Sequence, residues 1–115
     1  MKAIDILDFE PVNGVDEEKV NDIYDSIVKN GWNGAPILTY GNCLLTGSHR
    51  QAALKKMFDN DLDLGFECAE DVTDIIDDKI SEGMSMEDIF GNLDYLREIF
   101  QGTRIEEYKE DLEEW

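Results

Sequence analysis

The sequence predicts an α+β domain with a small mixed sheet and packed helices. Three observations lead to this class: a short apolar run at residues 36–40 is followed by the turn dipeptide Gly41-Asn42, and amphipathic patterns of helical period lie before and after it. The 115 residues are enough for one domain with a modest core. The expected architecture is therefore a sheet of about four strands with helices against it.

Four segments are expected to supply the strands. Residues 3–9 and 36–40 are rich in apolar and β-prone side chains, and residues 43–46 return after the turn. Residues 64–69 are expected to add the strand that closes the sheet.

The first helix is expected to open at residues 15–18, with Asp16 as the N-cap, and to end at Asn30-Gly31. Its apolar stripe has helical spacing. The stripe consists of Val20, Ile23, Tyr24, Ile27 and Val28. The next helix is expected to follow Gly47, with Ser48 as its N-cap. Its apolar face consists of Ala52, Ala53, Leu54 and Met57, with Lys55 and Lys56 outside.

Residues 71–115 are expected to be helical throughout. A stripe from Val72 to Ile80 ends at Gly83, capping boxes are expected at 85–88 and 103–106, and a last apolar stripe runs from Ile105 to Trp115. We therefore divide the chain into a domain over residues 1–70 and an acidic helical extension over residues 71–115, packed together as one structural unit.

The charge of −18 is unevenly distributed. Residues 1–58 hold eight acids and six Lys or Arg, whereas residues 59–115 hold twenty acids and four Lys or Arg. This balance argues against direct binding of nucleic acid, because attraction to phosphates supplies most of that affinity. It is compatible with a basic protein partner bound through residues 70–115, with mimicry of nucleic acid, or with a solvated acidic surface.

The composition also bears on localisation. No apolar run is long enough to span a membrane, and the acidic N-terminal stretch does not resemble a signal peptide. Cys43 and Cys68 are not spaced as metal ligands, so no metal site is expected. A reduced, cytoplasmic protein is the expectation.

The residues with the clearest chemistry are Thr46-Gly47-Ser48-His49-Arg50. A glycine before a helix exposes backbone N–H groups, and the helix dipole adds partial positive charge there. The side chains of Ser48, His49 and Arg50 can donate hydrogen bonds to the same anion. The same residues also fit an ordinary capped helix after a hairpin.

Gly47-Ser48-His49-Arg50, followed by Gln51-Ala52-Ala53-Leu54, resembles the signature of the ParB/sulfiredoxin-like superfamily. The order of elements around it is also similar, over roughly residues 4–70. The resemblance implies a small ParB/sulfiredoxin-like sheet and a nucleotide, CTP, ATP or ADP, with Mg²⁺. Gly47, Ser48, His49 and Arg50 would hold its phosphates.

The resemblance also implies roles in hydrolysis or phosphoryl transfer. Glu10 and His49 are the catalytic candidates, with Glu10 as general base, and Thr46 or Glu10 would assist Mg²⁺ binding or proton transfer. Ser48 stands where sulfiredoxins carry their nucleophilic cysteine, which argues against sulfiredoxin activity. The acidic residues 71–115 replace the basic helix-turn-helix of ParB-type proteins, which argues against a partition function.

Two functions from different classes remain open. The first is a nucleotide-binding domain that either binds alone or hydrolyses or transfers phosphate. The second is a catalytically inactive acidic protein of phage or plasmid type, which inhibits a basic, nucleic-acid-binding protein. The apolar stripes near the C-terminus are also compatible with a homodimer.

Overall fold

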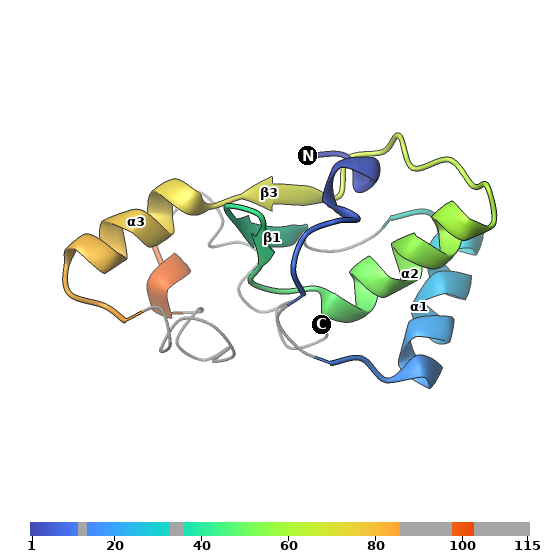
Figure 1. Cartoon of the computed structure of the whole chain (residues 1–115), viewed down its shortest axis with the longest axis horizontal. Helices are drawn as coiled ribbons and strands as arrows, with labels where there is room; N and C mark the ends of the chain where they lie inside the picture. Colours follow the sequence, from blue (N-terminus) through green and yellow to red (C-terminus); the bar gives the residue numbers. More distant parts are fainter. Residues whose placement is uncertain (12–13, 33–35, 86–97, 103–115) are drawn as a thin grey trace.

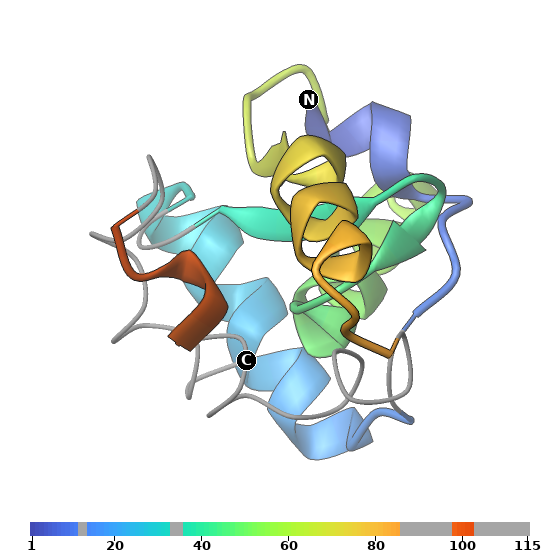
Figure 2. The same ribbon diagram turned by 90° about the vertical axis from the view of Figure 1, so that its left-hand side faces the viewer.

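The computed structural model describes residues 1–11, 14–32, 36–85 and 98–102. The elements in chain order are η1 (Ala3–Ile6), α1 (Glu17–Asn30), β1 (Ile37–Tyr40), β2 (Cys43–Leu44), α2 (Ser48–Asp59), β3 (Ala69–Asp71) and α3 (Thr73–Ser81). The predicted α+β class is confirmed. The sheet lies in the middle, with α1 and α2 on one side and α3 on the other (Figure 1). Figure 2, viewed from the α3 end, shows α3 in front of the sheet.

The described sheet is mixed and has three strands in the order β2-β1-β3. The antiparallel pair β1–β2 places Tyr40 opposite Cys43, so the predicted turn at Gly41-Asn42 is confirmed. The parallel pair β1–β3 places Ile37 opposite Ala69. The closing strand therefore begins at Ala69, the last residue of the predicted range 64–69, and the sheet has three strands in the described part of the chain where about four were expected.

The predicted strand at residues 3–9 is also wrong, because residues 3–6 form the 3-10 helix η1. Asp5 accepts a hydrogen bond from the Lys2 backbone N–H (3.0 Å), which favours a local turn. The buried residues are Ala3 and Ile6, three apart as in a 3-10 helix, whereas Ile4 is exposed. The N-terminal segment meets the sheet on either side of η1: Met1 exchanges backbone hydrogen bonds with Ala69 of β3, and Glu10 forms an isolated bridge with Cys43 of β2.

The predicted limits of α1 are confirmed. The Asp16 carboxylate accepts from the Glu18 N–H at 2.9 Å, and Gly31 ends the helix with its N–H donating to the Ile27 carbonyl. Both caps are local in sequence, so the sequence is sufficient to predict them.

The start of α2 differs from the prediction by one residue. Gly47 is the N-cap, in the left-handed conformation (φ 86°, ψ 26°), and Ser48 is the first helical residue. The Ser48 side chain is buried, which explains why this residue does not serve as the cap.

The sheet separates two apolar cores, because alternate residues of β1 point to opposite faces. Ile37 belongs to the core shared with η1, α1 and α2, and Leu38 belongs to the core shared with α3, Ile99 and Phe100.

Residues 71–85 are helical only in part. Asp71 ends β3 and Val72 is the N-cap of α3, so the prediction of helix from residue 71 is wrong. The boundary drawn after residue 70 lies inside β3. The predicted stripe is present, with Val72, Ile75 and Ile76 buried.

Farther along the predicted helical cluster, residues 98–100 are helical, and Ile99 and Phe100 are buried. The end of the capping box at 85–88, the apolar positions from Ile89 to Leu96 and the last stripe from Ile105 to Trp115 lie outside the described residues. Within the described ranges, none of the helices has the length and apolar character needed to cross a membrane.

Candidate functional site

The start of α2 packs directly against β1. A Cβ atom built on Gly47 would lie 2.7 Å from Cγ1 of Ile37, and φ at Gly47 is +86°. Both features require glycine, because real Cβ contacts are longer and side chains disfavour this backbone region. The conformation of Gly47 therefore sets the position of the first turn of α2 against the sheet.

Thr46 and Ser48, on either side of Gly47, are both 2% exposed. Thr46 Oγ1 accepts a hydrogen bond from the Leu38 N–H at 3.1 Å, and the Leu45 N–H donates to the Leu38 carbonyl at 2.8 Å. The Thr46 hydroxyl therefore continues the β1–β2 pairing. Because a hydroxyl has one O–H and two lone pairs, this bond leaves Thr46 with its O–H donor and one lone pair.

His49 joins the first turn of α2 to the first turn of α1. Its Nε2 accepts a hydrogen bond from the Asp16 N–H at 3.0 Å. An accepting Nε2 places the ring proton on Nδ1 in the neutral imidazole. That Nδ1 atom is buried and has no hydrogen-bond partner among the residues that the structure describes. The geometry therefore leaves a buried donor within the first turn of α2.

Arg50 lies over the ring of Trp32, with 4.3 Å from the guanidinium carbon to the ring centroid. Trp32 in turn contacts Phe66, with ring centroids 6.2 Å apart. A guanidinium stacked on an aromatic face is held in one orientation by a cation–π contact. Trp32 thus packs in the core and also positions Arg50.

Gln51 shows which side of α2 faces the N-terminal segment. Its side-chain amide donates to the carbonyls of Ile6 (2.9 Å) and Phe9 (2.7 Å). Gln51 follows His49 by two residues, which is about 200° around a helix. The structure therefore directs His49 toward α1 and Gln51 toward residues 6–9.

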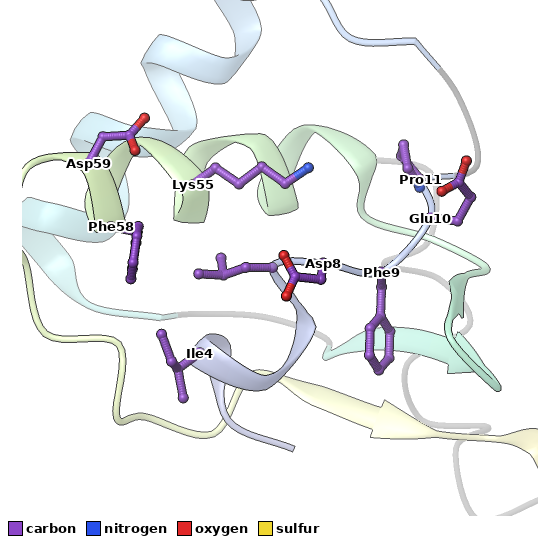
Figure 3. A pocket seen from close by; sticks show the side chains of 9 residues that line it. Ile4, Asp8, Phe9, Glu10, Pro11, Lys55, Phe58 and Asp59 are labelled. Atoms are coloured by element: carbon purple, nitrogen blue, oxygen red, sulfur yellow. The ribbon is translucent and has the colours of Figure 1, made fainter.

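Glu10 lies on the Gln51 side of α2. Its exposed side chain lines a cavity of about 640 Å³ together with Lys55, and neither His49 nor Arg50 lines that cavity (Figure 3). The structure thus brings Thr46, Gly47, Ser48, His49 and Arg50 together at the start of α2. It places the Glu10 carboxylate in a separate hollow.

Sequence reasoning does not identify the contacts of three residues at the start of α2 or in the neighbouring hollow. Gln51 and Lys55 occupy ordinary helix positions in the pattern, and Asp16 is expected only as a cap. A glutamine between apolar positions of a packed helix is the available signal for Gln51, since a buried amide needs partners. Nothing in the sequence indicates that the Asp16 backbone meets His49.

The described residues contain no group of three or more His, Cys, Asp or Glu side chains arranged to hold a metal ion. Comparisons with models of protein families, with curated proteins and with solved structures gave no match for this chain.

Proposed function

We propose that this chain binds a nucleotide through its phosphates at the N-terminal end of α2, with Gly47, Ser48, His49 and Arg50 around the phosphates. The observation that carries the proposal is the buried Nδ1 donor of His49, which has no acceptor among the described residues. A buried donor is normally paired, so an acceptor from outside the chain is a physical reason for its position.

The cap of α2 supports the same proposal. Gly47 has no side-chain oxygen, so no cap occupies the place where Ser, Thr or Asp would accept from the first-turn N–H groups. An anion at this place would accept from backbone N–H groups and gain from the helix dipole. Arg50 adds a fixed positive charge at the same end of the helix.

The proposal includes Mg²⁺ bound together with the nucleotide. Asp16, Glu17 and Glu18 open α1, close to His49, and would repel a bare polyphosphate. Mg²⁺ commonly binds through phosphates and only one or two carboxylates, so it would reduce this repulsion without a metal site formed by the protein alone. Only binding is proposed, because the Glu10 side chain lines a hollow that neither His49 nor Arg50 lines.

The same proposal places the protein in the cytoplasm. Nucleotides are abundant there, and a reducing compartment agrees with the free thiols of Cys43 and Cys68.

Thermal unfolding with Mg²⁺ and each of CTP, ATP, ADP and GTP tests the proposal. A ligand at about a hundred times its Kd adds roughly 2.7 kcal/mol of stability. We expect one nucleotide to raise Tm for the native chain and not for Arg50→Ala. Lys19→Ala, an exposed cation on α1, is the matched control and should keep the shift. Unchanged Tm with every nucleotide at millimolar concentration would contradict the proposal.

A second candidate function rests on the acidic side of α3. Four carboxylates are exposed on or beside this helix, Asp74, Asp77, Asp78 and Glu82. Its lysine, Lys79, pairs with Glu82 at 3.6 Å. We propose as the alternative that this surface occupies the nucleic-acid site of a basic protein. The acids at 106–114 that would extend it lie outside the described residues.

Competition on DNA tests this alternative. The chain should displace a basic DNA-binding protein from immobilised DNA, and less so as salt increases. Asp74→Asn with Asp78→Asn should weaken displacement, whereas Asp22→Asn with Asp25→Asn on α1 is the control of equal charge. Equal loss in both pairs would indicate diffuse electrostatic attraction between the whole acidic chain and the basic protein, and would reject this surface.

A further inference from the structure

Two adjoining hollows lie beside α2, and neither His49 nor Arg50 lines them. The first has a volume of about 640 Å³ and is lined by η1, the segment after it and α2 (Figure 3). The second has a volume of about 440 Å³ and is lined largely by residues 61–65. Ile4 and Phe58 line both hollows, so the hollows adjoin, and together they are called the groove.

Exposed apolar side chains line part of both hollows. Ile4, Phe58 and Leu62 are 46%, 55% and 37% exposed, and they are three of the five large hydrophobic side chains that are exposed among the described residues. Single exposed apolar residues are common on protein surfaces, but several that gather in one hollow mark an interaction site. The gathering therefore requires an occupant with apolar side chains.

The rim of the groove is acidic. Five carboxylates line the two hollows, Asp8, Glu10, Asp59, Asp61 and Asp63, against one ammonium group, Lys55. None of the five belongs to an ion pair among the residues that the structure describes. The occupant must therefore also carry positive charge, which excludes the acidic parts of this chain and a second copy of it on grounds of repulsion.

We propose that this groove binds an extended segment of a partner protein in which Lys or Arg side chains accompany apolar ones. The apolar side chains of the segment cover Ile4, Phe58 and Leu62. The basic side chains lay their methylene stems along the groove and extend their charged ends to the carboxylates. Apolar contact supplies affinity in such an interface, and the charges set register and partner choice.

A free polyamine is the competing occupant, because it also carries regularly spaced positive charges. It would neutralise the rim but bring no side chains to cover Phe58. The exposed aromatic ring therefore favours the protein segment. This proposal does not depend on nucleotide binding at the start of α2.

The test begins with a displayed library of short random peptides, selected on the full chain. We expect the enriched peptides to combine Lys or Arg with apolar residues. One enriched peptide is then synthesised with a fluorescent label, and its Kd is measured by anisotropy for the native chain and for the variants below.

The charge variants are matched pairs. Asp8→Asn with Asp59→Asn removes two carboxylates from the groove, and Asp22→Asn with Asp25→Asn removes two exposed carboxylates from α1. The groove pair should raise Kd about tenfold, which corresponds to about 1.4 kcal/mol, and the α1 pair should leave Kd within about twofold.

The apolar variants are matched by exposure. Ile4 and Val15 are each 46% exposed, and only Ile4 lines the groove. Ile4→Ala should raise Kd at least about fivefold, and Val15→Ala should leave it unchanged. All four variants alter exposed side chains, and their circular dichroism should match the native spectrum.

Several results would overturn the proposal. Enrichment of no peptide, or of peptides without basic residues, would remove the charge argument. Equal weakening by the two Asn pairs would show diffuse attraction instead of a groove. Spermidine that competes as strongly as the unlabelled peptide would identify a polyamine as the occupant.

Discussion

Substitution of Gly47 by alanine tests the contact on which the candidate nucleotide site depends. The added Cβ would lie 2.7, 3.2 and 3.3 Å from three side-chain carbons of Ile37, which is fully buried. Overpacking of this kind costs about 1–3 kcal/mol. A positive φ adds about 1–2 kcal/mol for a residue with a side chain. Alanine also reduces the conformational freedom of the unfolded chain, which offsets about 0.4–1 kcal/mol of this loss. The expected loss is therefore about 2–4 kcal/mol.

Gly41→Ala is the matched control. Gly41 also has a positive φ, +58°, but nothing lies within 4 Å of the place that an added Cβ would occupy. It should lose only about 1 kcal/mol, from the backbone and unfolded-state contributions. The difference between the two variants isolates the contact with Ile37.

Urea unfolding followed by circular dichroism measures both losses, with an unchanged m-value as the sign that the unfolded state is unaffected. A double-mutant cycle with Ile37→Ala identifies the contact, because Gly47→Ala should cost less once the two γ carbons of Ile37 are gone. If Gly47→Ala costs no more than Gly41→Ala, the start of α2 does not lie against β1. The geometry of the proposed phosphate site would then be refuted.

Three further predictions concern buried or paired polar groups. Gln51→Leu removes the side-chain donor from the Phe9 carbonyl and leaves the Ile6 carbonyl with the Phe9 N–H alone, and it should cost about 1–3 kcal/mol in urea unfolding; Gln51→Glu should cost at least as much, because a carboxylate would face both carbonyls. Burial raises the pKa of the Cys68 thiol from 9.0 to about 12, so the unfolded state loses its proton first as pH rises. Stability should fall above pH 9, by less than about 1.4 kcal/mol per pH unit, and the fall should be smaller in Cys68→Ala. The hydrogen bond from Tyr40 to Asp77 (2.7 Å) raises the pKa of Tyr40 above 10.0, so the stability that it contributes is present below that pH and is lost as pH rises. Asp77→Asn should bring the pKa of the Tyr40 phenol back toward its ordinary value. The titration is followed by ultraviolet absorbance, with Tyr40→Phe as the reference that lacks this phenol.

Local signals are sufficient for several elements of the fold. The cap at Asp16, the stop at Gly31 and the turn at Gly41-Asn42 each depend on hydrogen bonds within a few residues. Sequence prediction fails where a competing interaction decides the structure. Residues 3–6 alternate well enough for a strand, but the Asp5 carboxylate closes a turn on Lys2. The start of β3 is set by its pairing with Ile37, which is distant in sequence.

At the candidate site, too, the sequence predicts what local signals decide and misses what distant contacts decide. The sequence locates Gly47, because a glycine before an amphipathic stretch is a local signal. It does not predict that His49 accepts from Asp16, 33 residues earlier, or that Arg50 stacks on Trp32. Both contacts depend on how α1 packs against α2, and side-chain periodicity carries no information on that pairing. The resemblance implies that Glu10 lies near the phosphates; the structure shows that its side chain lines the hollow beside α2, and the catalytic role stays a prediction.

The position of Glu10 makes the two proposed sites separable by experiment. Arg50 lies in the first turn of α2, and Asp59, its last residue, lines the same hollow as Asp8. Arg50→Ala should abolish stabilisation by nucleotide and leave the peptide Kd within about twofold; Asp8→Asn with Asp59→Asn should do the reverse. Loss of both activities in either variant would mean that one ligand surface extends from the groove to the start of α2. The Glu10 carboxylate would then lie within that surface, and a catalytic role for it would become the next hypothesis to test with Glu10→Gln.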